Sequence, residues 1–137
     1  MNYASIYNLA SADRIVAPLF KTEITQHHAI YLGFNDYGQE LVAENHTNEG
    51  VRIITAAQFF NDHPKLTRIE KFRGNYFQRN MAVNKALGLV GTEYDLFRYN
   101  CEHYAEEVQH GIAKSQQVTN FLVAMGVLAG FFILTAE

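Results

Sequence analysis

The spacing of apolar residues changes along the chain, and this change constrains the fold more than any other feature of the sequence. Up to residue 72 the apolar residues form short strand-like runs, whereas residues 77–90 carry them at helical spacing. The expected strands are residues 14–19, 28–32, 40–44, 51–54 and 67–72. Because residues 34–38 (FNDYG) favour a tight turn, the second and third strands should form a hairpin. The sequence therefore predicts an α+β fold with a small antiparallel sheet packed against helices.

Size, charge and cysteine content exclude several classes of protein. The chain has 137 residues, which suits one compact domain. Its 11 Lys and Arg residues, against 14 Asp and Glu, give a formal net charge of −3. This balance argues against a nucleic-acid partner, which basic side chains would have to hold. A single cysteine excludes an internal disulfide and a multi-cysteine metal site, so we expect neither a metal nor another cofactor.

The C-terminal residues 118–137 are the most apolar part of the chain. No charged residue occurs from Val118 to Ala136, and Phe121 to Leu134 is apolar or glycine throughout. As a helix, residues 118–136 would be about 28 Å long, close to the ~30 Å hydrocarbon core of a bilayer. A helix buried in the globule is the alternative.

We expect this segment to be a membrane anchor, which divides the chain into a folded domain (residues 1–117) and an apolar C-terminal helix (residues 118–137). The N-terminal sequence lacks the charged start and apolar core of a secretion signal. We therefore expect a membrane-associated protein whose folded domain lies on the cytoplasmic side.

The only thiol, Cys101, lies where a helix should begin. Asn100 is a good N-cap, so Cys101 would be the first helical residue. Helical spacing places Cys101 on one apolar face with Tyr104, Ala105, Val108 and Ile112, and directs the sulfur at the sheet. A helix N-terminus favours the thiolate and thus a reactive cysteine. A small buried apolar residue is the alternative reading of Cys101.

A nucleophilic thiol needs a base, and histidine is the usual base at neutral pH. His27 and His28 begin a predicted strand, where adjacent side chains face opposite sides. His28 shares a face with Ile30, and His27 shares the other face with Ala29. Strand parity alone does not decide which face the cysteine helix covers. The remaining histidines are expected to be structural, in loops or at a helix end: His63, His103 and His110.

Two segments of the chain resemble a known family. HHAIYLG (residues 27–33), followed far downstream by NCEHYA (residues 100–105), is similar to the lecithin:retinol acyltransferase-like family of circularly permuted papain-type thiol enzymes. The resemblance covers roughly residues 10–118 and includes KSQQV (residues 114–118). It implies that His27 is the base and Cys101 the nucleophile, and it places His28 at a variable position of the motif. His28 and Asn100 are candidate supporting residues.

The third polar residue of the expected site departs from the family pattern. Family members carry a second histidine on the following strand, where this chain has Leu41-Val42-Ala43-Glu44-Asn45. We expect Glu44 to take this place, since a carboxylate can orient an imidazole through its far nitrogen. His46 would serve if the strand register shifted by two residues. Tyr31 is a further candidate for a hydroxyl near the site, and an ordinary packed tyrosine is the favoured alternative.

The resemblance implies acyl transfer through a Cys101 thioester, with a glycerophospholipid or another acyl ester as donor and with water or a second molecule as acceptor. A phospholipase A-type hydrolase and an acyltransferase fit this chemistry equally. Two other functions stay open at this point. The first is a thiol amidase or peptidase, and the second is a non-enzymatic interaction module that keeps the family fold.

Overall fold

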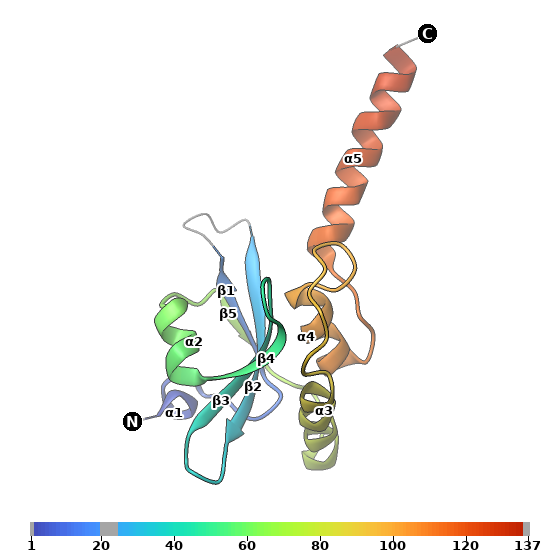
Figure 1. Cartoon of the computed structure of the whole chain (residues 1–137). Helices are drawn as coiled ribbons and strands as arrows, with labels where there is room; N and C mark the ends of the chain where they lie inside the picture. Colours follow the sequence, from blue (N-terminus) through green and yellow to red (C-terminus); the bar gives the residue numbers. More distant parts are fainter. Residues whose placement is uncertain (1, 20–24, 136–137) are drawn as a thin grey trace.

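The structure is a computed structural model that describes residues 2–19 and 25–135, with the backbone alone for residues 128–135. Five antiparallel strands form one sheet in the order β4–β3–β2–β1–β5 (Figure 1). Their bounds are β1 Arg14–Pro18, β2 Gln26–Phe34, β3 Glu40–His46, β4 Gly50–Thr55 and β5 Arg68–Glu70. All the predicted strands are present, and β2 and β3 form the expected hairpin. These elements confirm the α+β class.

Helices cover both faces of the sheet. Their bounds are α1 Tyr3–Tyr7, α2 Ala56–Asp62, α3 Tyr76–Gly88, α4 Cys101–His110 and α5 Gln116–Thr135. In Figure 1, α1 and α2 lie on one side of the sheet and α3 and α4 on the other, while α5 extends away from the globule. Helix α1 was not predicted, because a helix of 5 residues is too short to show a helical period.

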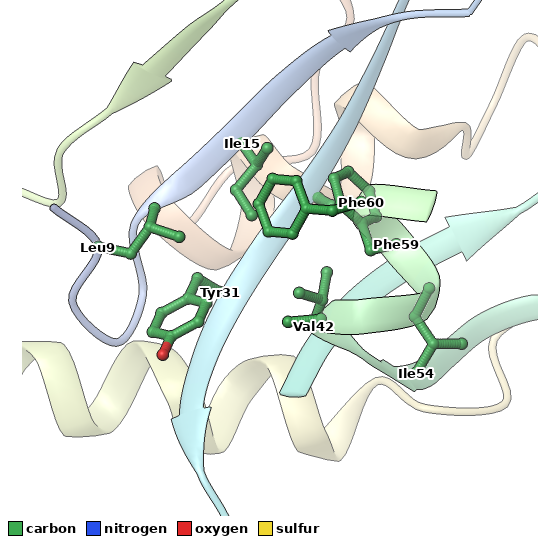
Figure 2. Close-up of a cluster of buried hydrophobic side chains, with 9 residues drawn as sticks. Leu9, Ile15, Tyr31, Val42, Ile54, Phe59 and Phe60 are labelled. Atoms are coloured by element: carbon green, nitrogen blue, oxygen red, sulfur yellow. The ribbon is translucent and has the colours of Figure 1, made fainter. Parts of the chain in front are cut away.

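Alternate residues of β2 point into two separate hydrophobic cores. Ala29 and Tyr31 belong to the core that β2 shares with α2, part of which is drawn in Figure 2. Ile30 belongs to the second core, beneath α3 and α4. Because side chains alternate along a strand, His27 emerges on the α2 face and His28 on the α4 face.

Helix α4 begins where the sequence predicts, because Asn100 caps it. The side chain of Asn100 accepts hydrogen bonds from the N–H groups of Glu102 and His103. The His103 imidazole accepts the Asn100 N–H in return, which completes a capping box. The cap therefore fixes the place of Cys101 at the first helical position, and His103 has the structural role expected of it.

The apolar face of α4 is as predicted over its first two turns. Cys101, Tyr104, Ala105 and Val108 are all buried. The predicted place of Ile112 on this face is wrong. Gly111 ends the helix with φ 81°, and Ile112 beyond it is 69 % exposed. Since glycine adopts positive φ without strain, the chain turns away from the sheet before it reaches Ile112.

Strands β2 and β3 separate at the end of the sheet that carries His27. Their pairing runs from Phe34↔Glu40 to Ala29↔Glu44. Within the described residues, β3 then continues to His46 alongside β4, and β2 continues back to Gln26 alongside β1. The first residue of α4 reaches this divergence, since the Cys101 sulfur lies 3.8 Å from the carbonyl oxygen of Gln26. The divergence lets a helix on one face bring its first side chain to His27, which emerges on the other face.

Helix α5 occupies most of the segment predicted to be a membrane anchor. Residues 136 and 137 of that segment lie outside the described residues. Among the helices of the described part of the chain, none is both long and apolar enough to cross a membrane. The structure therefore gives no support to the expectation of a membrane-spanning helix at residues 118–137.

Candidate active site

Cys101, His27 and Glu44 come together where β2 and β3 diverge. The Nε2 atom of His27 lies 2.8 Å from Oε1 of Glu44. The same imidazole forms a hydrogen bond with the Cys101 thiol. Because Nε2 faces the carboxylate, Nδ1 is the ring nitrogen left for the sulfur. Only 5 % of Cys101 and 6 % of His27 is exposed, so both hydrogen bonds are largely shielded from water.

The surroundings of His27 favour its charged form. Burial alone would lower its pKa, but the hydrogen bonds and negative charges of Cys101 and Glu44 raise the pKa of His27 to about 9. His27 is therefore an imidazolium at neutral pH. A cation beside a thiol stabilises the thiolate, and the start of α4 adds the favourable end of the helix dipole. The arrangement thus places the only thiol of the chain and a proton donor in direct contact.

Arg52 holds Glu44 in its ionised form. Its Nε lies 2.9 Å and its Nη2 2.7 Å from Oε2 of Glu44, which leaves Oε1 for His27. Burial would raise the pKa of Glu44, but the hydrogen bonds and positive charges of His27 and Arg52 lower it to about 2. Such two-point contacts fix the carboxylate plane as well as its charge. Arg52 was missed in the sequence, because its role depends on the pairing of Glu44 with Arg52 across β3 and β4.

His28 belongs to a different buried network on the α4 face. Its Nδ1 accepts a hydrogen bond of 2.9 Å from Nε of Arg14, and its Nε2 lies 3.3 Å from Oε2 of Glu102. A ring nitrogen that accepts from arginine cannot carry a proton, so His28 is neutral with its proton on Nε2. Burial and the positive charge of Arg14 also lower the pKa of His28, against the opposing effect of Glu102.

His63 covers the ring of His27. The two imidazoles stack with centroids 4.9 Å apart and 17° between their planes. His63 also packs on Phe59 at 4.8 Å and donates a hydrogen bond to the carbonyl of Pro18. Burial and the charge of His27 lower the pKa of His63, so the stacked ring is neutral. His63 was predicted only to lie in a loop, because its contact with His27 depends on the packing of α2 on the sheet.

His27, Glu44 and His63 offer ligand atoms within 4.8 Å of one another, the spacing of a small metal site. The donors already have partners, however. Nε2 of His27 faces Glu44, and the other carboxylate oxygen of Glu44 is bound by the positive charge of Arg52. A cation would have to displace these contacts, remove a proton from His27 and stand beside the positive charge of Arg52. The cluster is therefore better suited to fix a proton than to hold a metal.

The remaining predicted site residues lie in different places. Asn100 borders the thiol and caps α4. The hydroxyl of Tyr31 donates to Glu40 at 2.9 Å, in a pair at the opposite end of β2. His46 lies at the end of β3, where its Nδ1 accepts from the N–H of Asn48 at 3.2 Å. The expectations for Tyr31 and His46 are thus corrected. The Tyr31 hydroxyl is bound to Glu40 away from the thiol, and in the unshifted register Glu44 pairs with Ala29, which shares the face of His27, so that Glu44 and not His46 reaches the imidazole.

A pocket of about 320 Å³ opens beside Cys101. It is lined by the ends of β1 and β2, by the loop before α4 and by the first turns of α5, and Cys101 and Asn100 contribute to its wall. Phe97 from the loop and Phe121 from α5 pack together with ring centroids 5.8 Å apart. A concave, mostly apolar space next to a nucleophile is a typical substrate site.

Gln117 joins α5 to the active site. Its Oε1 accepts the N–H of Gln26 at 3.1 Å, and its Nε2 donates to Oε2 of Glu102 at 2.9 Å. It thereby links the residue before His27 to the residue after Cys101, and it also lines the pocket. Gln117 lies in the KSQQV segment, but the sequence does not indicate these contacts. Gln26 is 91 residues and Glu102 is 15 residues away along the chain.

Fold and site together define the class of the protein. A cysteine at the start of a helix faces a histidine on a sheet, and the histidine precedes the cysteine in the chain, which is the reverse of the papain order. The chain belongs to the family of permuted papain-like amidase enzymes (YaeF/YiiX, C92 family), whose model matches residues 7–107. This membership confirms the permuted papain-like fold and the resemblance seen in the sequence.

Two human proteins are similar to parts of the chain. Phospholipase A and acyltransferase 2 of Homo sapiens is 42 % identical over 53 residues, which cover 37 % of this chain and 33 % of the relative. Phospholipase A and acyltransferase 3 of Homo sapiens is 40 % identical over 47 residues, which cover 33 % and 29 %. The matches thus span about a third of these relatives' length.

Proposed function

We propose that the chain is a thiol-dependent acyltransferase or phospholipase A-type hydrolase. In this proposal Cys101 takes an acyl group from a glycerophospholipid as a thioester and passes it to water or another acceptor. One observation carries the proposal: the buried pair of Cys101 and His27, oriented by Glu44, borders an apolar pocket. The names of the two human relatives support an ester of a phospholipid as the donor.

The first step forms the thioester. The Cys101 thiolate attacks the ester carbonyl carbon, and a carbon–sulfur bond forms while the carbonyl oxygen becomes an oxyanion. The backbone N–H of Cys101 lies at the start of α4 and is a donor close to a carbonyl bonded to its own sulfur. When the carbon–oxygen bond to the leaving alcohol breaks, the alcohol takes the proton of the His27 imidazolium.

The second step releases the acyl group. Neutral His27 accepts a proton from water or an acceptor alcohol or amine, whose oxygen or nitrogen attacks the thioester carbonyl. The carbon–sulfur bond breaks, and the Cys101 thiolate and the His27 imidazolium are restored. Glu44 stabilises the imidazolium in both resting and final states through its 2.8 Å contact with Nε2.

An amidase is the second candidate function, because the matched family is described as one of amidase enzymes. The same thiolate and imidazolium could cleave an amide, with the proton of His27 going to the leaving amine. The two functions differ in the leaving group and share the acyl-enzyme. They can be separated by the substrate that acylates the protein.

The test is the intact mass of the protein after incubation with phosphatidylcholine vesicles or, in parallel, with a peptide amide. We expect a fatty-acyl adduct with the vesicles alone, and no adduct when Cys101 is replaced by Ala. His110→Ala is the control, because the His110 side chain is 59 % exposed on the far end of α4. An adduct from the peptide alone would favour the amidase, and equal behaviour of Cys101→Ala would contradict both enzymes.

We also propose that the enzyme works at a membrane surface, with the catalytic domain on the cytoplasmic side. The first turns of α5 expose apolar side chains beside the pocket, among them Leu122, which is 56 % exposed. We expect Leu122→Asp to reduce binding to phospholipid vesicles in a flotation assay. Phe34→Asp is the matched control, because Phe34 is 54 % exposed in the β2–β3 hairpin. Equal binding of all three proteins would contradict this placement.

A further inference from the structure

We propose that the pocket beside Cys101 is a subsite for one apolar acyl chain, and that Phe97 and Phe121 determine which chain lengths it binds. The proposal rests on the proposed function, since it names the group that the Cys101 thioester would carry. Its evidence is separate: the composition of the pocket wall and the aromatic pair within that wall.

The wall of the pocket contains no formal charge among the residues that the structure describes. Its members are apolar, aromatic, hydroxyl or amide residues, such as Leu19, Leu96 and Val118. A peptide terminus, a carboxylated side chain or a phosphate in this space would lose its hydration without gaining a counter-ion, which is costly. A hydrocarbon chain has no charge whose hydration would be lost, and the burial of its apolar surface is favourable. The wall therefore favours an alkyl group over a charged one.

The position of the sulfur fixes where the chain begins. Cys101 and Gln26 both lie in the pocket wall, with the Cys101 sulfur 3.8 Å from the Gln26 carbonyl oxygen, and His27 contacts the same sulfur from β2. An acyl carbon bonded to this sulfur cannot extend toward the sheet, because β2 is there. In this proposal the methylene groups of the acyl chain extend into the pocket, between the ends of β1 and β2, the loop before α4 and the first turns of α5.

Phe97 and Phe121 lie where the chain would pass. They come from two elements that line the pocket, the loop before α4 and helix α5, and their ring centroids lie 5.8 Å apart with 42° between the planes. Each residue is 50 % exposed, so half of each side chain still faces water. An acyl chain that reaches the pair would cover this exposed aromatic surface. Short chains would not reach it, which makes the pair selective for length.

The expected effect follows from the burial of methylene groups. Each added methylene that leaves water should raise kcat/KM about fourfold, until the chain extends beyond the pair. A p-nitrophenyl ester series from acetyl to octanoyl measures this dependence on the full-length protein. A p-nitrophenyl ester of succinate is the charged counterpart of the butyryl ester. We expect its kcat/KM to be at least about 10²-fold lower, because its carboxylate meets no counter-ion among the described residues of the wall.

Single variants test the aromatic pair. Phe97→Ala and Phe121→Ala should lower kcat/KM about tenfold for the octanoyl ester and less than about twofold for the acetyl ester. Because the rings touch, the double variant should lose less than the product of the two single losses. Val123→Ala is the matched control, since Val123 is 61 % exposed on α5 and does not line the pocket. It should leave the whole series unchanged.

The outcomes separate this proposal from the proposed function. A flat ester series, a succinyl ester as good as the butyryl ester, or equal losses for all esters in the phenylalanine variants would overturn the acyl-chain subsite. An acetyl adduct on Cys101 in the same samples would show that thioester chemistry survives that result. Failure of every ester to acylate Cys101 would instead overturn the proposed function itself.

Discussion

His27 and His28 are neighbours in the chain, yet they have opposite chemistry. His27 faces α2, contacts the thiol and Glu44, and has a pKa raised to about 9. His28 faces α4, accepts from Arg14, and has a pKa lowered by burial and by that positive charge. Two imidazoles on opposite faces of one strand can therefore differ in charge, one a cation and the other neutral. The partners decide, not the degree of burial, because both rings are buried.

The sharpest way to break this comparison is to remove each ring in turn. His27→Asn should lower kcat/KM for a phospholipid or a soluble ester by about 10³-fold or more, since it removes both the stabilising cation and the proton donor. His28→Asn should lower kcat/KM less than about tenfold. It should instead lower the free energy of unfolding by about 2 kcal/mol, because Arg14 and Glu102 lose a buried hydrogen-bond partner. Similar kinetic losses in the two variants would contradict the separate roles.

The second prediction concerns the carboxylate. Glu44→Gln should lower kcat/KM about 10–10²-fold, because the imidazolium loses its compensating charge. The alkaline limb of the pH–rate profile should also move to lower pH, since Glu44 helps to hold the pKa of His27 at about 9. Glu49→Gln is a matched control, because Glu49 contacts the same Arg52 at 2.9 Å but does not contact His27. A control as impaired as Glu44→Gln would indicate that Arg52 and not Glu44 matters.

The third prediction is the pH dependence of stability. A pKa raised in the folded state contributes stability that is complete below the ordinary value of 6.5 and is lost as pH rises through about 9. Urea unfolding of the wild-type protein and of His27→Asn should therefore differ most near pH 6.5 and least above pH 9. We expect the difference to change by on the order of 1–3 kcal/mol. A difference that grows with pH would contradict the charged pair.

The smallest expected effect concerns the stacked ring. His63→Phe keeps a ring over His27 and should retain kcat/KM within about twofold, whereas His63→Ala should lower it about three- to tenfold by exposing the imidazolium face. Parallel ester assays of the two variants make this test. Equal losses would instead point to the hydrogen bond from His63 to the Pro18 carbonyl, which both variants lack.

Much of the fold could be predicted because it depends on local patterns. The strand runs, the hairpin and the Asn100 cap are visible in the residues themselves, and they place Cys101 at the start of α4. The hairpin also predicts which face of the sheet carries Glu44. Glu44 pairs with Ala29, and Ala29 lies on the same face of β2 as His27.

The unpredicted contacts depend on packing between distant elements. Arg52 reaches Glu44 across a second strand pair, and His63 reaches His27 only because α2 folds back onto the sheet. Gln117 meets Gln26 through the path of α5. Strand parity could not decide between His27 and His28 as the base either. That choice depends on the divergence of β2 and β3, which no spacing in the sequence reports.

The most direct test of the account is the protonation state of His27 in the resting protein. Nitrogen-15 NMR of histidine-labelled protein can follow each imidazole through a pH titration, and His27→Asn assigns the resonance. We predict that His27 is an imidazolium at neutral pH with a pKa of about 9, and that Cys101→Ala lowers this pKa. A His27 that titrates near 6.5 in both proteins would contradict the charged imidazole beside Cys101 on which the proposed catalysis depends.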